Sequence, residues 1–308
     1  MVLKGNFHFN KGPEGLDDAV EYYKKAIAID SAYAYAHIGL GWAFYQQTLS
    51  GEYFSKIGFE MARKEIEKGL SLEVTAANKH SAHNTLAYIN LWEYNWNDAK
   101  AEYEKAFAIN PKRDDFNAFY HSFVLGKTAD AISIFKKVSE ENPLDVLNLR
   151  DFAVIQYLAR KFSDAIQTCD KILELDPSFH EAYRIKGFVF SAEKKPDSAL
   201  AYLKKAADLG NPWAPILTIT TLSYIGKRQE ARKIYSQVDS MAQGKTPAIA
   251  KALIYHSLGD RNKAFEWLER SYDEKDFYLA TLRVDPIWDP LRGDPRFQRL
   301  MKKMNFPD

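Results

Sequence analysis

An alanine that recurs about every 34 residues constrains this sequence more than any other feature. Each of these anchor alanines begins a short amphipathic segment, as in Ala99–Pro111 and Ala165–Pro177. Successive anchors are 43, 37, 32, 34, 34, 32 and 33 residues apart. Self-similarity at such a period indicates stacked units, none of which buries its apolar face alone. The anchors are Ala19, Ala62, Ala99, Ala131, Ala165, Ala199, Ala231 and Ala264.

Positions that were not used to choose the anchors test the repeat. The residues four positions after the anchors are all apolar or aromatic: Tyr23, Ile66, Tyr103, Phe135, Cys169, Leu203, Tyr235 and Leu268. The residues seven positions after them are all small or medium in size: Ala26, Gly69, Ala106, Val138, Ile172, Ala206, Val238 and Ser271. Small residues on one helix face let neighbouring helices approach, and the large residue between them fills the gap.

Proline and glycine mark helix ends and turns in the repeat. Pro111, Pro143 and Pro177 follow their anchors by twelve positions and end the helix. Gly126, Gly226 and Gly259 precede their anchors by five positions, where a tight turn between paired helices needs a permissive backbone. The first spacing of 43 predicts a longer loop around residues 46–59, marked by Gly51 and Gly58.

With this period and this pattern, the chain resembles the tetratricopeptide repeat (TPR) family. The resemblance implies an all-α fold: a right-handed superhelical solenoid of about eight helix pairs with a C-terminal capping helix. We expect the repeat array to cover residues 1–276 and the cap to cover residues 277–308. Composition agrees, because a chain that is 46% hydrophobic and poor in Gly and Pro suits a helical protein.

The two ends of the chain carry a more specific resemblance. The segment Leu282–Met304 is similar to the ends of TPR tails on bacterial winged-helix regulators, nucleotide cyclases and serine/threonine kinases. The opening Leu3–Lys11 resembles the start of such tails. The sequence has no winged-helix pattern, kinase Gly-rich loop or cyclase domain, so the chain is either a fragment of a longer regulator or a stand-alone relative. The absence of a capping sequence before the first helix favours a fragment.

Three Asp-Pro pairs in this tail predict helix starts. Asp285, Asp289 and Asp294 each offer an N-cap carboxylate, followed by Pro at the first helical position. The helix after the third pair places four apolar residues on one face that could seal the last repeat. They are Phe297, Leu300, Met301 and Met304.

A partner-binding groove is predicted by analogy with the family on the leading helix of each repeat. Aromatic and Arg side chains dominate that surface, and these residue types are common hot spots of protein interfaces. Arg150 and Arg184 could bind carboxylates of an extended or helical peptide. The alternative is that several of these rings pack between repeats. The predicted groove residues are Tyr35, Trp42, Tyr45, Asn84, Tyr88, Trp92, Phe116, Tyr120, Arg150, Tyr157, Arg184, Phe188 and Trp213.

The sequence contains no pattern that indicates another class of function. With 42 Lys and Arg against 41 Asp and Glu, the net charge of +1 does not favour nucleic acid as a partner. No apolar run approaches the roughly 18 residues of a membrane span, and the single Cys169 excludes an intramolecular disulfide, so we expect a cytoplasmic protein. His80 and His83 could share a metal, but no third ligand follows at a matching spacing, and packing explains them better.

These observations predict a non-enzymatic scaffold without a cofactor or a metal. It would bind a protein or peptide that could carry an acidic group, and the resemblance of the tail implies a role in bacterial signalling or transcriptional regulation. The alternative is a sensory module in which a small molecule, held between repeats, controls an output domain of a longer regulator. The sequence leaves the oligomeric state open.

Overall fold

The computed structural model describes residues 1–50, 55–111 and 115–307, and these residues form helices and turns without a β-strand. Two compact units divide the chain. Unit 1 contains Met1–Phe116 and Glu274–Ala280, and unit 2 contains Asn117–Asp273 and Thr281–Asp308. The predicted all-α fold is confirmed.

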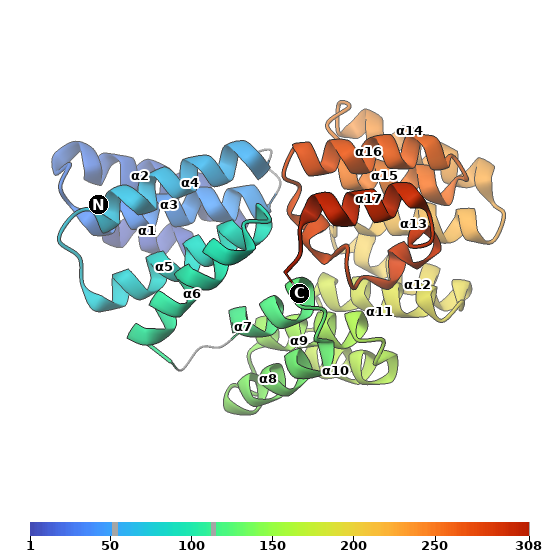
Figure 1. Cartoon of the computed structure of the whole chain (residues 1–308), viewed down its shortest axis with the longest axis horizontal. Helices are drawn as coiled ribbons and strands as arrows, with labels where there is room; N and C mark the ends of the chain where they lie inside the picture. The colour runs from blue at the N-terminus through green and yellow to red at the C-terminus, as the bar shows by residue number, and fades with distance from the viewer. Residues whose placement is uncertain (51–54, 112–114, 308) are drawn as a thin grey trace. The chain divides into compact units, whose positions relative to one another are not determined.

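Unit 1 is made of helices that pack against their neighbours along the chain (Figure 1). Those helices are α1 (Val2–Phe9), η1 (Pro13–Gly15), α2 (Leu16–Ile29), α3 (Ala34–Leu49), α4 (Ser55–Leu70), α5 (Ala76–Trp92) and α6 (Trp96–Ile109). Helix α7 (Asp115–Phe119) crosses the boundary at Phe116, and the short helix η3 (Phe277–Thr281) crosses it again at Ala280.

Unit 2 continues the same arrangement. After the last residues of α7 it contains η2 (Tyr120–Val124), a π-helical turn that extends α7. The helices that follow are α8 (Thr128–Glu141), α9 (Val146–Leu158), α10 (Phe162–Leu175), α11 (His180–Ala192), α12 (Pro196–Asp208), α13 (Ala214–Tyr224), α14 (Arg228–Met241), α15 (Ala248–Ser257), α16 (Arg261–Asp273), η4 (Pro286–Leu291) and α17 (Pro295–Met304).

The helices alternate between two roles. In each pair the second helix carries the anchor alanine, and all eight anchor side chains are 0% exposed. The first helices of neighbouring pairs also contact one another, as α3 does with α5 and α9 with α11. We call the surface that these first helices form the first-helix face. Close packing around a methyl group thus explains why the repeat requires alanine at the anchor.

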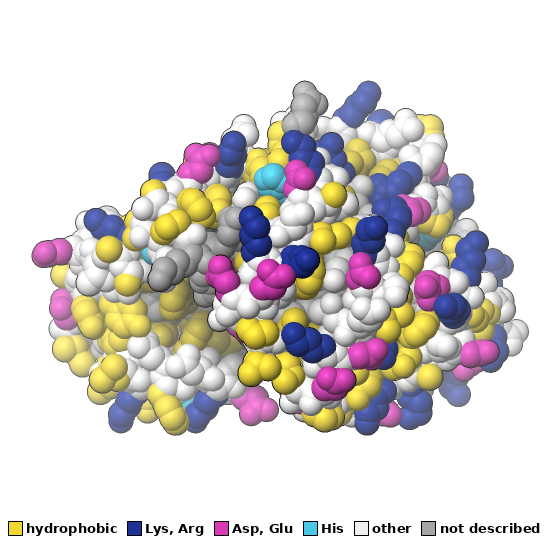
Figure 2. All heavy atoms as spheres, turned by 90° about the horizontal axis from the view of Figure 1, so that it is seen from below, with side chains coloured by type: hydrophobic (Ala, Val, Ile, Leu, Met, Phe, Trp, Pro, Cys, Tyr) yellow, Lys and Arg dark blue, Asp and Glu magenta, His cyan; other side chains and the backbone are white. Residues whose placement is uncertain are grey.

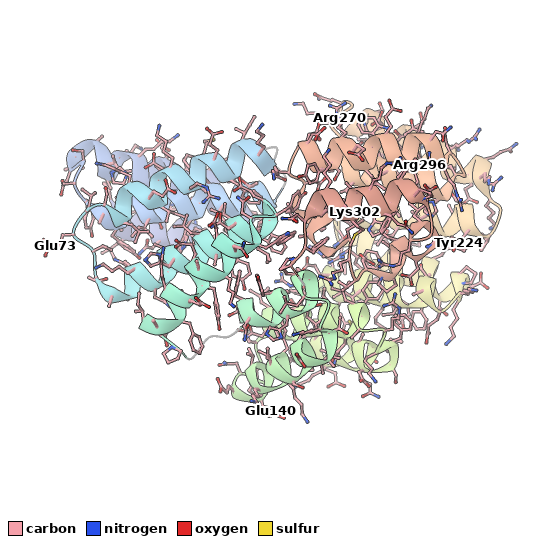
Figure 3. All side chains as sticks on the ribbon, in the orientation of Figure 1. Glu73, Glu140, Tyr224, Arg270, Arg296 and Lys302 are labelled. Carbon is pink, nitrogen blue, oxygen red and sulfur yellow. The ribbon has the colours of Figure 1, made fainter. Side chains whose placement is uncertain are left out.

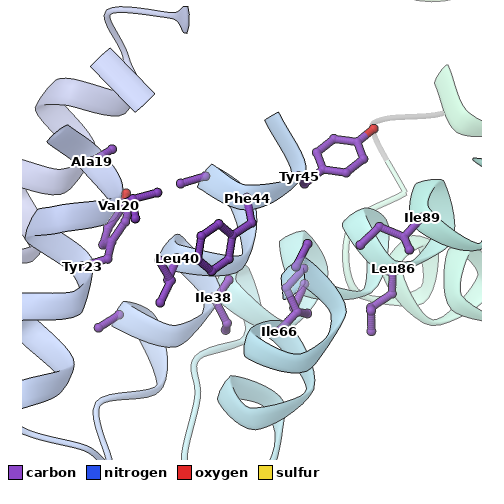
Figure 4. Packing of buried hydrophobic residues seen from close by; sticks show 14 of the residues in the cluster. Ala19, Val20, Tyr23, Ile38, Leu40, Phe44, Tyr45, Ile66, Leu86 and Ile89 are labelled. Atoms are coloured by element: carbon purple, nitrogen blue, oxygen red, sulfur yellow. The ribbon is translucent and has the colours of Figure 1, made fainter. Parts of the chain in front are cut away.

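The core of unit 1 shows the same packing in detail (Figure 4). Tyr23 of α2 lies almost fully buried against α3, and its ring rests on Gly39. A Cβ atom at Gly39 would lie 2.5 Å from the ring atom Cε1, so no larger residue fits there without displacement. The large residue four positions after the anchor therefore fills the space between helices, as the sequence pattern predicts.

The turn between paired helices has a constant backbone conformation. The residue five positions before the anchor has positive φ in six pairs of the described chain. Glycine occupies this position in three of them, with φ between 69° and 91°. The other three carry side chains: Tyr94 at 67°, Arg160 at 59° and Lys194 at 58°. A non-glycine residue in this region is uncommon and costs free energy.

The second repeat differs from the prediction. Helix α3 includes residues 46–49 and helix α4 includes residues 55–59 of the predicted loop, and residues 51–54 lie outside the described residues. Gly58 lies inside α4, and Gly51 lies outside the described residues.

In the tail, the structure confirms two of the three predicted helix starts. Asp285 caps η4 by accepting a hydrogen bond from the backbone N–H of Ile287, and Asp294 caps α17 in the same way through Arg296. The third prediction is wrong, because Asp289 lies inside η4, where its carboxylate binds Arg160 and Arg292. Phe297, Leu300 and Met304 are buried, Met301 is partly buried, and α17 packs against α16.

Candidate functional site

Unit 1 gathers seven of the predicted groove residues on α3, α5 and the start of α7. Two hydrogen bonds join α3 to α5: Trp42 Nε1 donates to Thr85 Oγ1 at 2.6 Å, and Trp92 Nε1 donates to the Tyr45 hydroxyl at 3.1 Å. These bonds hold the two indole rings against the neighbouring helix, so each ring keeps one orientation. The seven residues are Tyr35, Trp42, Tyr45, Asn84, Tyr88, Trp92 and Phe116.

Tyr88 lies at the centre of this set. Its hydroxyl donates to Asp115 Oδ2 at 2.8 Å, and its ring stacks on Trp92 with centroids 6.2 Å apart. The edge of Phe116 meets the same ring at 5.2 Å. Phe116 is only 1% exposed and Tyr45 is buried, so these two rings pack in the core, as the alternative interpretation expects. The remaining five residues of the set are half-buried and present part of their surface to solvent.

Helix α1 covers one end of this face. Asn6 bridges two tyrosines, because its Oδ1 accepts from the Tyr23 hydroxyl and its Nδ2 donates to the Tyr35 hydroxyl at 2.9 Å. Phe9 stacks on Trp42 with centroids 5.9 Å apart. The opening helix is therefore part of the face, although its sequence contains no cap.

Unit 2 holds the two predicted groove arginines, and both are already paired. Arg150 contacts the carboxylates of Asp151 at 2.7 Å and Glu181 at 3.2 Å. Burial acts to lower the pKa of Arg150, but these two carboxylates outweigh it and hold that pKa above its ordinary value. Arg184 lies 3.7 Å from Glu181 and over the ring of Phe188. Internal carboxylates thus compensate both cations.

Tyr157 contacts the chain's own tail. Its side chain is 5% exposed, and its hydroxyl donates to Asp285 Oδ1 at 3.0 Å. Burial and the nearby carboxyl raise the pKa of Tyr157, and burial raises the pKa of Asp285 to about 6 despite the hydrogen bonds that it accepts. Tyr120 is buried as well, and Trp213 forms the N-cap of α13. The tail therefore occupies the first-helix face at Tyr157.

Sequence reasoning missed two residues of this face, Tyr94 and Arg160. Both occupy the turn position where other pairs have glycine, and both bind the tail. The Tyr94 hydroxyl donates to the carbonyl oxygen of Asp276 at 2.6 Å, and Arg160 Nη2 donates to both carboxylate oxygens of Asp289 at 2.8 Å. The signal in the sequence is a large side chain where three other pairs have glycine, although Lys194 also carries one and is exposed.

The candidate histidines and the cysteine have packing roles. His83 Nδ1 lies 2.6 Å from Glu102 Oε2, and His80 Nδ1 lies 2.9 Å from the carbonyl oxygen of Ala106. In the described part of the chain no three His, Cys, Asp or Glu residues are placed to hold a metal ion. Burial raises the pKa of the Cys169 thiol to about 12, so the thiol is protonated at neutral pH.

One hollow of about 380 Å³ lies beside α17. The lining residues all come from the tail, whereas the small-molecule hypothesis places its ligand between repeats. They are Arg283, Met301, Lys302, Asn305, Phe306 and Pro307.

The outer surface is mixed in charge. Glu140, Arg270 and Lys302 project from the second helices and from α17 (Figure 3). Lys and Arg are interspersed with Asp and Glu on the face seen in Figure 2. Among the described helices, none combines the length and the apolar character that a membrane span requires.

Comparisons with known proteins agree with this architecture. The tetratricopeptide repeat family model matches residues 248–275. TPR repeat-containing protein MJ1428 of Methanocaldococcus jannaschii is 26% identical over 176 residues, which cover 56% of this chain and 30% of that protein.

Two solved structures have similar folds. The Rap protein in complex with competence and sporulation factor is 14% identical, with a TM-score of 0.63 over 98% of this chain and 96% of that chain. Yeast Tom70 is 16% identical, with a TM-score of 0.54 over 94% of this chain and 62% of that chain. The period, the buried anchors and these matches support a tetratricopeptide repeat protein.

Proposed function

We propose that this protein is a non-enzymatic scaffold that binds a peptide segment of a partner protein on the first-helix face of unit 1. The TPR fold is typical of protein–protein interaction. One observation carries the proposal: Trp42, Tyr88 and Trp92 are fixed by hydrogen bonds and stacking, yet they remain half-buried. Rigid, partly exposed aromatic rings bind peptides at a low cost in side-chain entropy.

The location of the aromatic side chains favours unit 1 over unit 2. In unit 2, a carboxylate on a partner would have to displace Asp151 or Glu181 from Arg150. In unit 1, Asn84 lies one helical turn from Tyr88 on α5 and offers a polar group beside the indoles. We therefore propose that apolar and aromatic contacts supply most of the affinity, and that an acidic group on the partner contributes less than the sequence alone predicts.

The cellular role is proposed on resemblance alone. The tail Leu282–Met304 resembles those of bacterial signalling proteins, so we propose a cytoplasmic role in signalling or transcriptional regulation. The Rap protein, which shares the fold, was solved with competence and sporulation factor bound, and this is an analogy at the level of fold.

Selection from a phage-displayed peptide library tests the proposal. Peptides that bind the wild-type protein should lose at least about tenfold in affinity for the variant Asn84→Arg, which places bulk and charge on the face and removes no packed ring. Fluorescence anisotropy with labelled peptides measures the effect. The variant Phe107→Ala serves as the matched control, because Phe107 is an aromatic residue on the second helix α6.

Circular dichroism must show that both variants retain the wild-type helical content and melting temperature. Equal binding to the wild type and to Asn84→Arg would exclude the first-helix face of unit 1 as the binding surface. Equal loss in both variants would show that the effect is not specific to this face.

A further inference from the structure

A seven-residue segment of the tail lies on unit 1 in the manner of a bound peptide. We call this segment, Glu274–Ala280, the inserted loop. It belongs to unit 1, whereas the segments on both sides of it, Asn117–Asp273 and Thr281–Asp308, belong to unit 2. The chain thus leaves unit 2 after α16, contributes seven residues to unit 1, and returns.

The inserted loop binds three consecutive residues at the C-terminal end of α5. Phe277 meets the face residue Trp92 edge-on, with centroids 6.0 Å apart. Lys275 Nζ donates to the carbonyl oxygen of Glu93 at 2.8 Å, and the Tyr94 hydroxyl donates to the carbonyl oxygen of Asp276 at 2.6 Å.

Two further features resemble peptide recognition. The ammonium of Lys275 lies 4.9 Å from the centre of the Tyr94 ring, a distance that allows cation–π attraction. Leu279, two residues after Phe277, is 0% exposed and belongs to unit 1 with the rest of the loop. A cation, an aromatic ring and a leucine therefore occupy alternate positions of the loop.

Tyr94 has a strained backbone conformation at this contact. Its φ of 67° lies in the region that Gly126, Gly226 and Gly259 occupy at the same repeat position. Glycine would adopt this turn without strain, whereas tyrosine adopts it at a cost in free energy. The side chain, which binds the inserted loop through both its ring and its hydroxyl, supplies the offsetting interaction.

We propose that the inserted loop is an internal ligand of unit 1, and that the partner peptide carries the same pattern, a basic residue, an aromatic residue and a leucine at alternate positions. This inference rests on the proposed function and specifies its partner. A tethered segment acts at an effective concentration of about millimolar, so it competes with any peptide added from outside. A partner with this pattern binds by displacing the loop from Trp92 and Tyr94.

A peptide with the sequence of residues 274–281, labelled with fluorescein, tests the inference on the full-length protein. The wild type should bind it weakly, because the inserted loop occupies the site. The variant Lys275→Ala with Phe277→Ala weakens the loop and leaves the face intact, so it should bind the peptide at least about tenfold more tightly. Addition of Tyr94→Gly, which keeps the turn and removes the side chain, should abolish this gain.

A control peptide with serine in place of the phenylalanine and the leucine should not bind any of these proteins. If the loop variant binds the peptide no more tightly than the wild type, the loop is not an internal ligand. If the gain survives Tyr94→Gly, the peptide binds elsewhere and the inference is also wrong.

Hydrogen exchange of the wild type gives a second test that does not depend on the folding of a variant. Excess peptide should deprotect the amides of residues 276–280 while α5 stays protected, and unchanged exchange of the loop would overturn the inference. Neither test uses an external partner. Library peptides that still require Asn84 would therefore leave the proposed function standing if the inference fails.

Discussion

Two aspartates in the tail show that the surroundings of a side chain, and not its local sequence, set its charge. Asp285 and Asp294 both precede proline and both cap a helix. Burial raises the pKa of Asp285 to about 6, whereas hydrogen bonds from the Arg296 side chain and backbone lower the pKa of Asp294 to about 2. In the same Asp-Pro dipeptide, the carboxyl group is thus harder to ionise at Asp285 and easier to ionise at Asp294.

The raised pKa of Asp285 predicts that its ionisation weakens the fold. Because the folded-state pKa lies above the ordinary value of 3.8, stability falls as the pH rises from about 4 to about 6. We expect Asp285→Asn, which keeps the cap, to raise stability at pH 7 by roughly 1–3 kcal/mol. The gain should vanish below about pH 4, where the wild-type carboxyl group is protonated in both states. Melting temperatures between pH 3.5 and 8 measure it.

Asp294→Asn is the matched control and should act in the opposite direction. Its carboxylate stabilises the fold above the ordinary pKa of 3.8, and this contribution is lost as the pH falls through about 2. The variant should therefore melt below the wild type at neutral pH. A shift of the same sign in both variants would contradict the assignment of opposite pKa changes.

Helix packing is set by small residues on the second helices. Ala99 of α6 is 0% exposed, and α6 packs against α5. Ala101 lies on the same helix with its side chain exposed. The same substitution at these two positions therefore separates packing from helix propensity.

We expect Ala99→Leu to destabilise the protein by roughly 1–3 kcal/mol, because the added atoms force α5 and α6 apart. Ala101→Leu should change stability by less than about 0.5 kcal/mol. Urea denaturation followed by circular dichroism measures both. Similar losses in the two variants would mean that the anchor position is not the point of close contact.

The helix pairs could be predicted from the sequence because each pair depends on neighbours about one repeat away, and that spacing is visible as a period. The path of the tail could not. Tyr94 and Asp276 are 182 residues apart, and Tyr157 and Asp285 are 128 residues apart. An irregular segment has no period that predicts where it will lie, so Tyr157 was assigned to a partner although the chain itself supplies one.

The division of the chain into two units predicts how local destabilisation spreads. In repeat proteins each unit is stabilised mainly by its neighbours, so a defect in α6 should loosen unit 1 more than unit 2. We expect Ala99→Leu to speed hydrogen exchange in residues 76–109 and also in residues 274–280. Mass spectrometry of peptic fragments should show little change in Thr281–Met304. If residues 274–280 follow α16 and not α5, the assignment of the inserted loop to unit 1 is wrong.

The inserted loop also has a consequence for the order of events on the ribosome. Unit 1 includes Glu274–Ala280, yet Glu274 follows Phe116 by 158 residues. At 5–20 residues per second, roughly 8–30 s separate the synthesis of these two parts. During that interval Trp92 lacks its contact with Phe277, and Tyr94 lacks its hydrogen bond to Asp276. The first repeats of the nascent chain are therefore open to a peptide or a chaperone for many seconds, a window that closes when translation reaches the tail.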